Sequence, residues 1–333
     1  MTSDRDKNPA RIRHTATSDD DGGRIDRVLA SRFPEFSRAQ IQRACAAGAV
    51  LVNGSPVKAN HRLVTGETVD VTLIRLPDAE APPLPEAIHL EIVHEDDQII
   101  VINKPAGMVV HPAAGHRTGT LVNALLGRES FSDDEVRASA GRPGIVHRLD
   151  KGTSGLIVCA RTETAHRHLA EQIKSRTLSR RYWAICWGHL RTSKIIFDKP
   201  VGRSSSDRKR MAVTARGRDA ETTVTLRERF AIADLIEAAL GTGRTHQIRV
   251  HLSNAGHPLV GDSDYGGGEH HLKGIDPQLR LLAKRMLATI DRPALHAHTL
   301  ALDHPISGNR LEFTVDPPAD FQALLKLCRS APS

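Results

Sequence analysis

The sequence predicts an α+β fold, with a mixed, largely antiparallel sheet in a large domain and a small domain ahead of it in the chain. Short apolar runs rich in β-branched residues alternate with stretches whose apolar residues recur at helical spacing. The predicted strands are too many, and the predicted helices too irregularly spaced, for a repeating βαβ series. A chain of 333 residues is also long enough for one large core and a smaller second one.

Four segments follow one another along the chain. Residues 1–23 are polar and charged, so we expect a disordered tail. Residues 24–76 form the small domain, and residues 77–87, rich in proline and alanine, are typical of a semi-rigid linker. Residues 88–328 form the large domain.

The small domain is expected to contain two short helices followed by a hairpin. Apolar residues recur at helical spacing from Ile25 to Phe33. Ser37 and Gln40 form a capping-box pattern that predicts the start of a second helix, which ends at Gly48. The predicted hairpin consists of a strand at 50–52, the turn pair Asn53-Gly54 and a strand at 68–73.

In the large domain, strands and helices are interleaved without a fixed period. The strand candidates are 90–93, 99–103, 156–161, 182–188 and 224–229. The helical candidates are 162–176, 245–255, 279–290 and 319–327.

Charge and cysteine content narrow the class of protein. There are 46 Lys and Arg against 39 Asp and Glu, and the sequence pI of about 9.5 indicates a polyanionic partner such as nucleic acid. The four cysteines stand far apart and the histidines form no metal-binding motif, so we expect no metal site and no disulfide. The N-terminus lacks the apolar stretch of a signal peptide or membrane anchor, and we therefore expect a cytoplasmic protein.

One charged loop lies between two predicted strands. Within the run 146–155, Asp150 stands between Arg148 and Lys151, and apolar strand material precedes and follows the run. Because strand ends can hold a loop rigidly, the run predicts a single carboxylate presented to an anionic ligand. A solvated charge run is the alternative, which the apolar flanks disfavour.

The same run resembles the signature around the catalytic aspartate of the RluA family of RNA pseudouridine synthases. Further segments resemble that family in the family's order, from about residue 24 to residue 327: 102–112, 180–182, 243–251, 257–262, 295–297 and 304–308. Residues 24–76 are similar to the alpha-L RNA-binding domain first described in a ribosomal small-subunit protein. This arrangement is that of the family's ribosomal large-subunit subgroup.

The resemblance implies the pseudouridine synthase fold and three catalytic residues. Asp150 matches the family's essential aspartate, and Arg249 matches the arginine that pairs with it. Tyr182 matches the tyrosine that stacks on the target base and is placed to take part in removing the C5 proton. Arg148 matches the arginine that fills the space left by the flipped-out nucleotide. The isomerisation involves no redox change, so we expect no cofactor.

The residues themselves support two of these roles and leave alternatives open. Ile248, Leu252 and Ala255 predict a buried helical stripe, with Arg249 immediately beside it. A half-buried arginine requires an anion, although that anion could be an acid with a purely structural role. Tyr182 begins an apolar strand, where an ordinary core tyrosine is the alternative.

Several basic residues and one glutamine outside the catalytic motifs are assigned to contacts with RNA. Each phosphate that a basic side chain neutralises adds affinity through counterion release. In the small domain these RNA-contact candidates are Arg38, Gln42, Arg43 and Lys58. In a Ser/Gly-rich loop of the large domain they are Arg208, Lys209 and Arg210. An ordinary basic helix and a solvated loop are the respective alternatives.

We therefore predict an enzyme that isomerises specific uridines in RNA, with large-subunit ribosomal RNA as the expected substrate, through an aspartate nucleophile acting on a flipped-out nucleotide. We expect RNA as the partner, no membrane association and a monomer. A non-catalytic RNA-binding factor for ribosome assembly is the alternative; it would keep the basic surface and lose the acid. A glycoside hydrolase is disfavoured because its usual mechanism needs two carboxylates.

Overall fold

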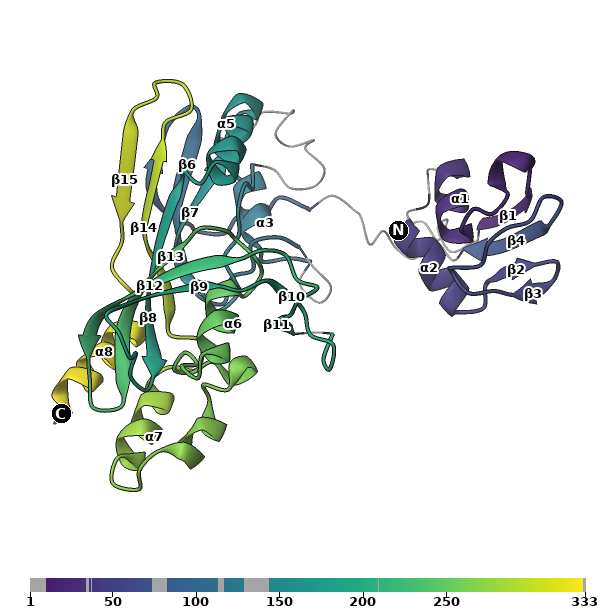
Figure 1. The fold of residues 1–333 in the computed structure, drawn as a ribbon. Helices are drawn as coiled ribbons and strands as arrows, with labels where there is room; N and C mark the ends of the chain where they lie inside the picture. Colours follow the sequence, from purple (N-terminus) through teal and green to yellow (C-terminus); the bar gives the residue numbers. More distant parts are fainter. Residues whose placement is uncertain are drawn as a thin grey trace, which may run out of the picture. The chain divides into compact units, whose positions relative to one another are not determined.

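The chain folds into two compact units. The computed structural model describes residues 10–33, 36, 38–73, 83–112, 117–128, 144–208 and 210–331. The units comprise residues 1–82 and 83–333, and each has its own hydrophobic core (Figure 1).

The N-terminal unit combines a four-stranded antiparallel sheet with two helices. Ile25 and Ile41 from the helices pack against Val50 of the sheet. Asn53 (φ 49°) and Gly54 (φ 80°) both have positive φ, as a two-residue hairpin turn requires. The elements are β1 (Ala10–Thr15), α1 (Ile25–Arg32), α2 (Arg38–Ala46), β2 (Val50–Val52), β3 (Ser55–Pro56) and β4 (Thr68–Leu73), and the sheet order is β1-β4-β2-β3.

The N-terminal unit begins earlier than the sequence predicted. The disordered tail was expected to extend to residue 23, but β1 pairs along its whole length with β4. Asp20, which is buried, accepts hydrogen bonds from the backbone of Thr17 and from Arg32, and lies 2.9 Å from His14. Polar and charged side chains between residues 10 and 23 therefore form hydrogen bonds and ion pairs inside the unit. Their polarity, which suggested disorder, is compatible with an ordered segment for this reason.

The predicted linker also ends earlier than expected. Residues 77–82 lie outside the described residues, but residues 83–87 pack on α3 (Leu121–Leu126). The Glu86 amide donates to the Asn123 carbonyl at 2.9 Å, and the Asn123 side chain donates to the Leu84 carbonyl at 2.8 Å. The capping residue predicted at Ser37 is outside the described residues.

The C-terminal unit is built on a nine-stranded sheet. Only β7 and β14 run parallel among the strand pairs of the described residues, so the predicted mixed, largely antiparallel sheet is confirmed. The strands, in their order across the sheet, are β5 (Glu91–Glu95), β6 (Ile99–Lys104), β7 (Ser154–Ala160), β14 (Leu295–Asp303), β8 (Ser179–Trp187), β13 (Ala233–Leu240), β12 (Glu221–Arg229) and β9 (Lys194–Asp198), with β15 (Arg310–Thr314) paired to β14. A separate hairpin is formed by β10 (Val201–Arg203) and β11 (Met211–Val213).

Helices cover both faces of this sheet (Figure 1). On one face, α3 and α6 (Gln247–Asn254) pack against Tyr182, Ala184 and Ile236. On the other face, α7 (Arg280–Thr289) and α8 (Ala319–Ser330) pack against Ile185 and Trp187, and α5 (Glu163–Lys174) packs against β6 and β7. The alternation along β8 therefore directs Tyr182 toward α6, while Trp183 and Ile185 pack on the side of α7 and α8. Short 3₁₀ helices, η2 (Ser263–Tyr265) and η3 (Glu269–Gly274), lie between α6 and α7.

The helix predicted at 245–255 is shorter than expected. It begins at Gln247, because His246 has a left-handed backbone (φ 57°), and it ends at Asn254. Ile248 and Leu252 are buried as predicted, but Ala255 follows the helix end and is exposed.

Gly155 is required where β7 meets β14. Its φ is 104°, and a Cβ atom there would lie 2.3 Å from the carbonyl oxygen of Ala297. Gly155→Ala should lower the free energy of unfolding by about 2–5 kcal/mol, because strained backbone and overpacking add. Urea unfolding would measure the loss. Gly308→Ala is the matched control, since Gly308 has φ 70° and no atom near the added Cβ; an equal loss in both variants would exclude the contact with Ala297 as a cause.

Candidate active site

The loop that carries Asp150 is fixed from three directions. The Gly107 amide donates to the carbonyl of Lys151 at 2.7 Å. Arg292, a buried residue held by Asp320, donates from Nη1 to the carbonyl of Gly152 at 3.0 Å. Inside the loop, the Thr153 amide donates to the carbonyl of Asp150 at 3.1 Å. The position of the Asp150 carboxylate is therefore set by the fold.

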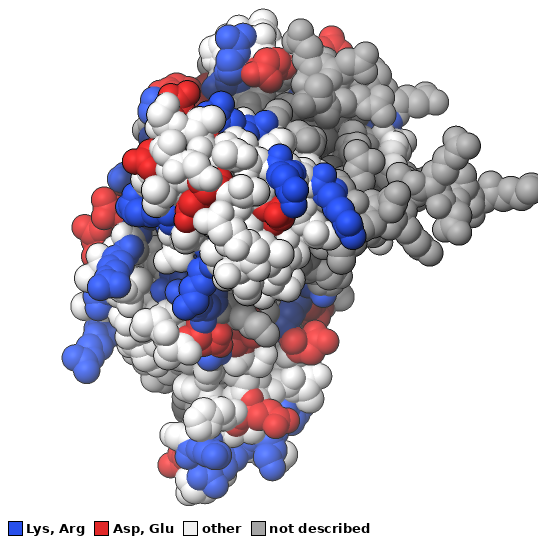
Figure 2. All heavy atoms as spheres, turned by 90° about the vertical axis from the view of Figure 1, so that its right-hand side faces the viewer, with Lys and Arg blue, Asp and Glu red and all other residues white. Residues whose placement is uncertain are grey.

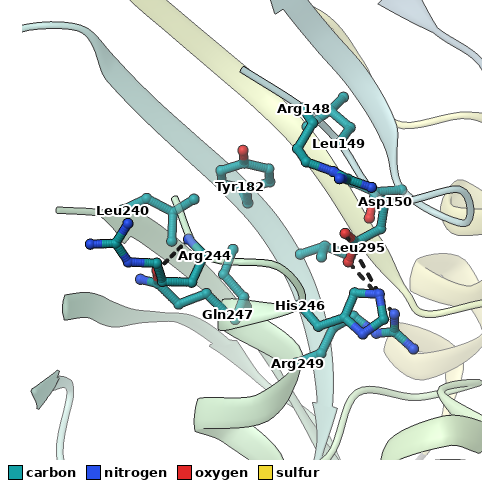
Figure 3. Close-up of a pocket in the computed structure, with 12 residues that line it drawn as sticks. Arg148, Leu149, Asp150, Tyr182, Leu240, Arg244, His246, Gln247, Arg249 and Leu295 are labelled. Carbon is teal, nitrogen blue, oxygen red and sulfur yellow. Dashed lines mark hydrogen bonds and ion pairs between the residues drawn. The ribbon is translucent and has the colours of Figure 1, made fainter. Parts of the chain in front are cut away.

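Asp150 lies in a small pocket between its own loop, β8 and α6 (Figure 3). The pocket volume is about 40 Å³, which is well below the roughly 300–1,000 Å³ of ordinary ligand sites. In this arrangement of the lining side chains the pocket is therefore too small to enclose a whole nucleoside. The lining residues are Arg148, Leu149, Asp150, Thr153, Tyr182, Leu240, Arg244, His246, Gln247, Ile248, Arg249 and Leu295.

Arg249 pairs with Asp150, as the sequence predicted. Its Nη1 atom lies 3.6 Å from Oδ2 of Asp150, and its side chain is only 6% exposed. A second acid orients it, because Nε and Nη2 each donate to a carboxylate oxygen of Asp262 at 2.7 Å. Burial opposes the charge of Arg249, but the hydrogen bonds to Asp262 outweigh it and raise the pKa of the guanidinium. Nη2 also donates to Oδ2 of Asp264 at 2.9 Å, so Arg249 contacts two acids besides Asp150.

His246 stands on the other side of the Asp150 carboxylate. Its Nε2 atom lies 3.9 Å from Oδ1 of Asp150, and its Nδ1 atom lies 2.8 Å from the hydroxyl of Tyr265. Figure 3 shows the imidazole directed at the carboxylate, beside Arg249. Asp150 is therefore flanked by one permanent cation and one titratable ring.

Tyr182 lines the pocket from the middle of the sheet. It is 4% exposed, and among the described residues its hydroxyl forms no hydrogen bond. Burial raises the pKa of its phenol, so the hydroxyl is protonated at neutral pH. A flat ring with an unengaged hydroxyl is suited to contact a planar base.

Arg148 is exposed and borders the pocket two residues before Asp150. Figure 3 shows its guanidinium on the side of the pocket opposite to Arg244. Arg244 is held in place, since its Nε donates to the carbonyl of Asp219 at 3.1 Å. The Arg148 side chain, in contrast, is exposed, so it can rotate when a ligand enters the pocket.

Two titratable residues near the Asp150 loop, Lys104 and His147, are buried. Lys104 donates from Nζ to the carbonyls of Pro105 and Met108, and burial lowers its pKa to about 7. His147 accepts a hydrogen bond from the Val158 amide, and burial lowers its pKa to about 3. Both shape the site from behind and are not exposed to a ligand.

Comparisons with known proteins identify the two domains of the chain and its family. Residues 98–254 match the family described as RNA pseudouridylate synthase, and residues 23–69 match the S4 domain. Ribosomal large subunit pseudouridine synthase D of Xanthomonas campestris is 44% identical over 308 residues, which cover 92% of this chain and 89% of that protein. The chain belongs to the RNA pseudouridylate synthase family. The predicted resemblance to the ribosomal large-subunit subgroup is confirmed.

A further similar sequence and a similar solved structure also carry the name RNA pseudouridine or pseudouridylate synthase. A Bacillus subtilis protein named uncharacterized RNA pseudouridine synthase YlyB is 41% identical, covering 95% of this chain and 97% of that one. The structure titled human RNA pseudouridylate synthase domain containing 4 is 24% identical, covers 73% of this chain and 95% of that one, and has a TM-score of 0.53. This last similarity shows the shared fold.

The RNA-contact candidates of the S4 domain fall into two groups. Arg38 and Gln42 both donate to Oδ2 of Asp26, at 2.9 and 2.6 Å. Burial opposes the ionisation of Asp26, but hydrogen bonds, first from Arg24 and then from these two side chains, hold its pKa well below the usual range. Arg38 and Gln42 thus also stabilise the domain. Arg43 and Lys58 are exposed.

The RNA-contact candidates of the synthase domain lie in the loop between β10 and β11. Arg208 and Arg210 are exposed, and Lys209 is outside the described residues. The Arg210 guanidinium lies 5.5 Å from the centre of the Tyr265 ring, which also contacts His246. This loop therefore joins the pocket region of the synthase domain. On the face shown in Figure 2, Lys and Arg side chains are interspersed with Asp and Glu.

Sequence reasoning missed four residues that hold the site. Asp262 orients Arg249, Arg292 holds the Asp150 loop, and His246 and Tyr265 form a pair beside the carboxylate. Only a weak signal was available, because Asp262 and His246 lie inside segments that resemble the family, without an assigned role.

Within the described ranges, no group of three or more His, Cys, Asp or Glu side chains is arranged to hold a metal ion. In the same part of the chain, no helix combines the length and the apolar character needed to cross a membrane.

Proposed function

We propose that this synthase isomerises specific uridines of RNA to pseudouridine, with large-subunit ribosomal RNA as the substrate and Asp150 as the nucleophile. The observation that carries the proposal is the Asp150 carboxylate, 16% exposed, with Nη1 of Arg249 at 3.6 Å, in a pocket that it shares with Tyr182. The names of the relatives support the substrate class, and the S4 domain supports binding to folded RNA.

In the proposed reaction the N1–C1′ glycosidic bond of uridine breaks, the uracil turns over, and a C5–C1′ bond forms. Loss of the C5 proton and protonation of N1 leave the overall composition unchanged. Asp150 would either bond to C1′ or, on a glycal route, take the C2′ proton as the N1–C1′ bond breaks and return it when the C5–C1′ bond forms. Arg249 holds the carboxylate in place, and Tyr182 stacks on the uracil and takes part in removal of the C5 proton.

We assign the pocket to a target nucleotide that has left its helix. In the proposed binding step the base displaces a lining side chain, since the pocket volume is about 40 Å³. Arg148, which is exposed, is the residue we assign to this movement. A planar guanidinium can stack on the neighbouring bases and bind phosphate, and so fill the space that the flipped nucleotide leaves.

Two measurements test this function. Tritium release from RNA that contains 5-tritiated uridine reports loss of the C5 hydrogen and should require the active protein. Mapping of pseudouridines in ribosomal and transfer RNA from a strain that lacks the protein should show missing sites in large-subunit ribosomal RNA. A complete set of sites in that strain would contradict the proposed substrate.

Removing residues 1–82 should weaken binding to large folded RNA and reduce its salt dependence. The lost S4 cations, Arg43 and Lys58 among them, would no longer displace phosphate counterions, and the slope of log K against log salt falls by about 0.9 per lost duplex phosphate contact. Salt titrations of binding would measure the slope. Residues 83–333 have their own core and contain the whole pocket, so the fragment should act slowly on a short stem-loop. A folded fragment without activity on any RNA would reject this division of labour.

A further inference from the structure

Two hydrogen bonds and one longer polar contact connect β11 with the Asp150 carboxylate. The amide of Met211, in β11, donates to the hydroxyl oxygen of Tyr265 at 3.1 Å. That hydroxyl lies 2.8 Å from Nδ1 of His246, whose Nε2 lies 3.9 Å from Oδ1 of Asp150. These contacts thus connect the hairpin that carries Arg208 and Arg210 with the acid in the pocket.

The hydrogen inventory of these contacts favours one form of His246. The Tyr265 oxygen accepts from the Met211 amide, and Nδ1 of His246 is the acceptor within reach of its hydroxyl proton among the described residues. The arrangement that uses this proton in a hydrogen bond has Tyr265 donating to an unprotonated Nδ1. In that arrangement a neutral imidazole holds its proton on Nε2, the atom that faces Asp150.

Burial keeps this imidazole neutral. It lowers the pKa of His246, although the charge of Asp150 raises it. The backbone of His246 is also unusual, because it adopts a left-handed conformation (φ 57°) immediately before α6. Such a conformation is uncommon for residues other than glycine and occurs frequently at functional sites.

We propose that His246 is a positioning residue that donates a hydrogen bond from Nε2 to Asp150, and that Tyr265 fixes the tautomer that makes this possible. The inference rests on the proposed function of Asp150. The 3.9 Å separation closes to hydrogen-bond length when the substrate excludes water, as catalytic contacts tighten on complex formation. With Arg249 on Oδ2 and His246 on Oδ1, both oxygens are engaged, so the carboxylate is held against rotation when it meets C1′.

Two substitutions at His246 separate the donor from the shape of the side chain. In His246→Gln the terminal NH₂ can reach the position of Nε2 and still donate to Asp150. In His246→Asn the shorter side chain reaches Tyr265 but not Asp150. Asn tolerates left-handed backbone better than Gln does, so backbone strain predicts the opposite order of activities.

We expect His246→Asn to lower kcat by about 10- to 100-fold, the range for loss of a hydrogen bond to a charged group, with little change in KM. His246→Gln should restore most of kcat. Equal losses in both variants, or a loss confined to KM, would overturn the donor role.

Tyr265→Phe tests the tautomer through a double-mutant cycle. The ring that packs 4.8 Å from the Arg249 guanidinium is kept, and only the hydroxyl is removed. In the wild-type background we expect kcat to fall severalfold, since His246 can then adopt either tautomer. In the His246→Gln background the same change should have no further effect. A full effect there would show that the hydroxyl acts through something other than His246.

Nitrogen NMR of protein labelled in histidine gives a readout that needs no RNA. The His246 signals are identified by their absence in His246→Gln. Wild type should show a protonated Nε2 and an unprotonated Nδ1, and Tyr265→Phe should show a mixture. A protonated Nδ1 in wild type would overturn the inference, even if the enzyme is active. If wild type releases no tritium from any RNA, the proposed function fails and the NMR result still decides the tautomer.

Discussion

Replacing Asp150 with asparagine is expected to abolish isomerisation while RNA affinity stays close to wild type. The change keeps the shape of the side chain and removes the negative charge that the reaction requires. The loss should exceed the roughly 10²- to 10⁴-fold typical of a single general acid or base, because Asp150 is the only carboxylate among the described residues that line the pocket. Tritium release from 5-tritiated uridine reports turnover, and filter binding reports affinity.

Asp97→Asn is the matched control for this substitution. Asp97 is exposed in the turn between β5 and β6, so the same chemical change there should leave turnover unaffected. Residual turnover of Asp150→Asn within about tenfold of wild type would contradict the assignment of Asp150 as nucleophile. A fall in affinity that matches the fall in turnover would instead assign Asp150 to binding.

The regular elements could be predicted where one pattern dominates a segment. The run at 99–102 is continuously apolar, and it lies in β6, where almost every residue is buried. The segment at 233–240, in contrast, forms the central strand β13 but carries Asp234 and Glu237. Asp234 is buried because it accepts a hydrogen bond from the Leu190 amide at 2.7 Å and lies 2.9 Å from His189. Such partners belong to other segments, so local pattern cannot reveal them.

The same reason explains the error in the N-terminal tail. The strand β1 has only six residues and is rich in arginine, and its pairing with β4 joins positions more than fifty residues apart. Arg13 pairs with Asp70 across this ladder at 2.6 Å. The sequence shows the charges of each strand separately, and only the fold shows that they neutralise each other.

Some residues of the candidate site could be predicted from the sequence, and others could not. Asp150, Tyr182 and Arg249 could be predicted because each stands in a segment that resembles the family, and the structure brings all three to one pocket. The hydrogen-bond partners that orient them could not. Asp262 approaches Arg249 from the 3₁₀ region after α6, and its selection depends on packing that no spacing rule describes.

Arg249 illustrates how the fold combines stability and chemistry. Its two hydrogen bonds to Asp262 fix the plane of the guanidinium, and Nη1 is then directed at Asp150. Three acids, Asp150, Asp262 and Asp264, share this one guanidinium, so the positive charge beside the Asp150 carboxylate is largely compensated. The Asp150 carboxylate therefore keeps its negative charge available to a cationic sugar, which is the electrostatic requirement of the proposed reaction.

Tyr182→Phe should separate the two roles proposed for this residue. The ring remains, so binding of substrate RNA should persist, whereas turnover should fall by about 10²-fold or more because the hydroxyl used in removing the C5 proton is lost. The fold should be unaffected, since among the described residues the hydroxyl makes no hydrogen bond that the change would break. Tyr182→Leu is the matched variant, because it removes the ring as well and should also weaken binding by the roughly 1–3 kcal/mol per base attributed to stacking. Turnover and affinity are measured for both variants on the same RNA. Full activity of the Phe variant, combined with weak binding of the Leu variant, would reduce Tyr182 to a stacking platform and assign the proton transfer to another group in the pocket.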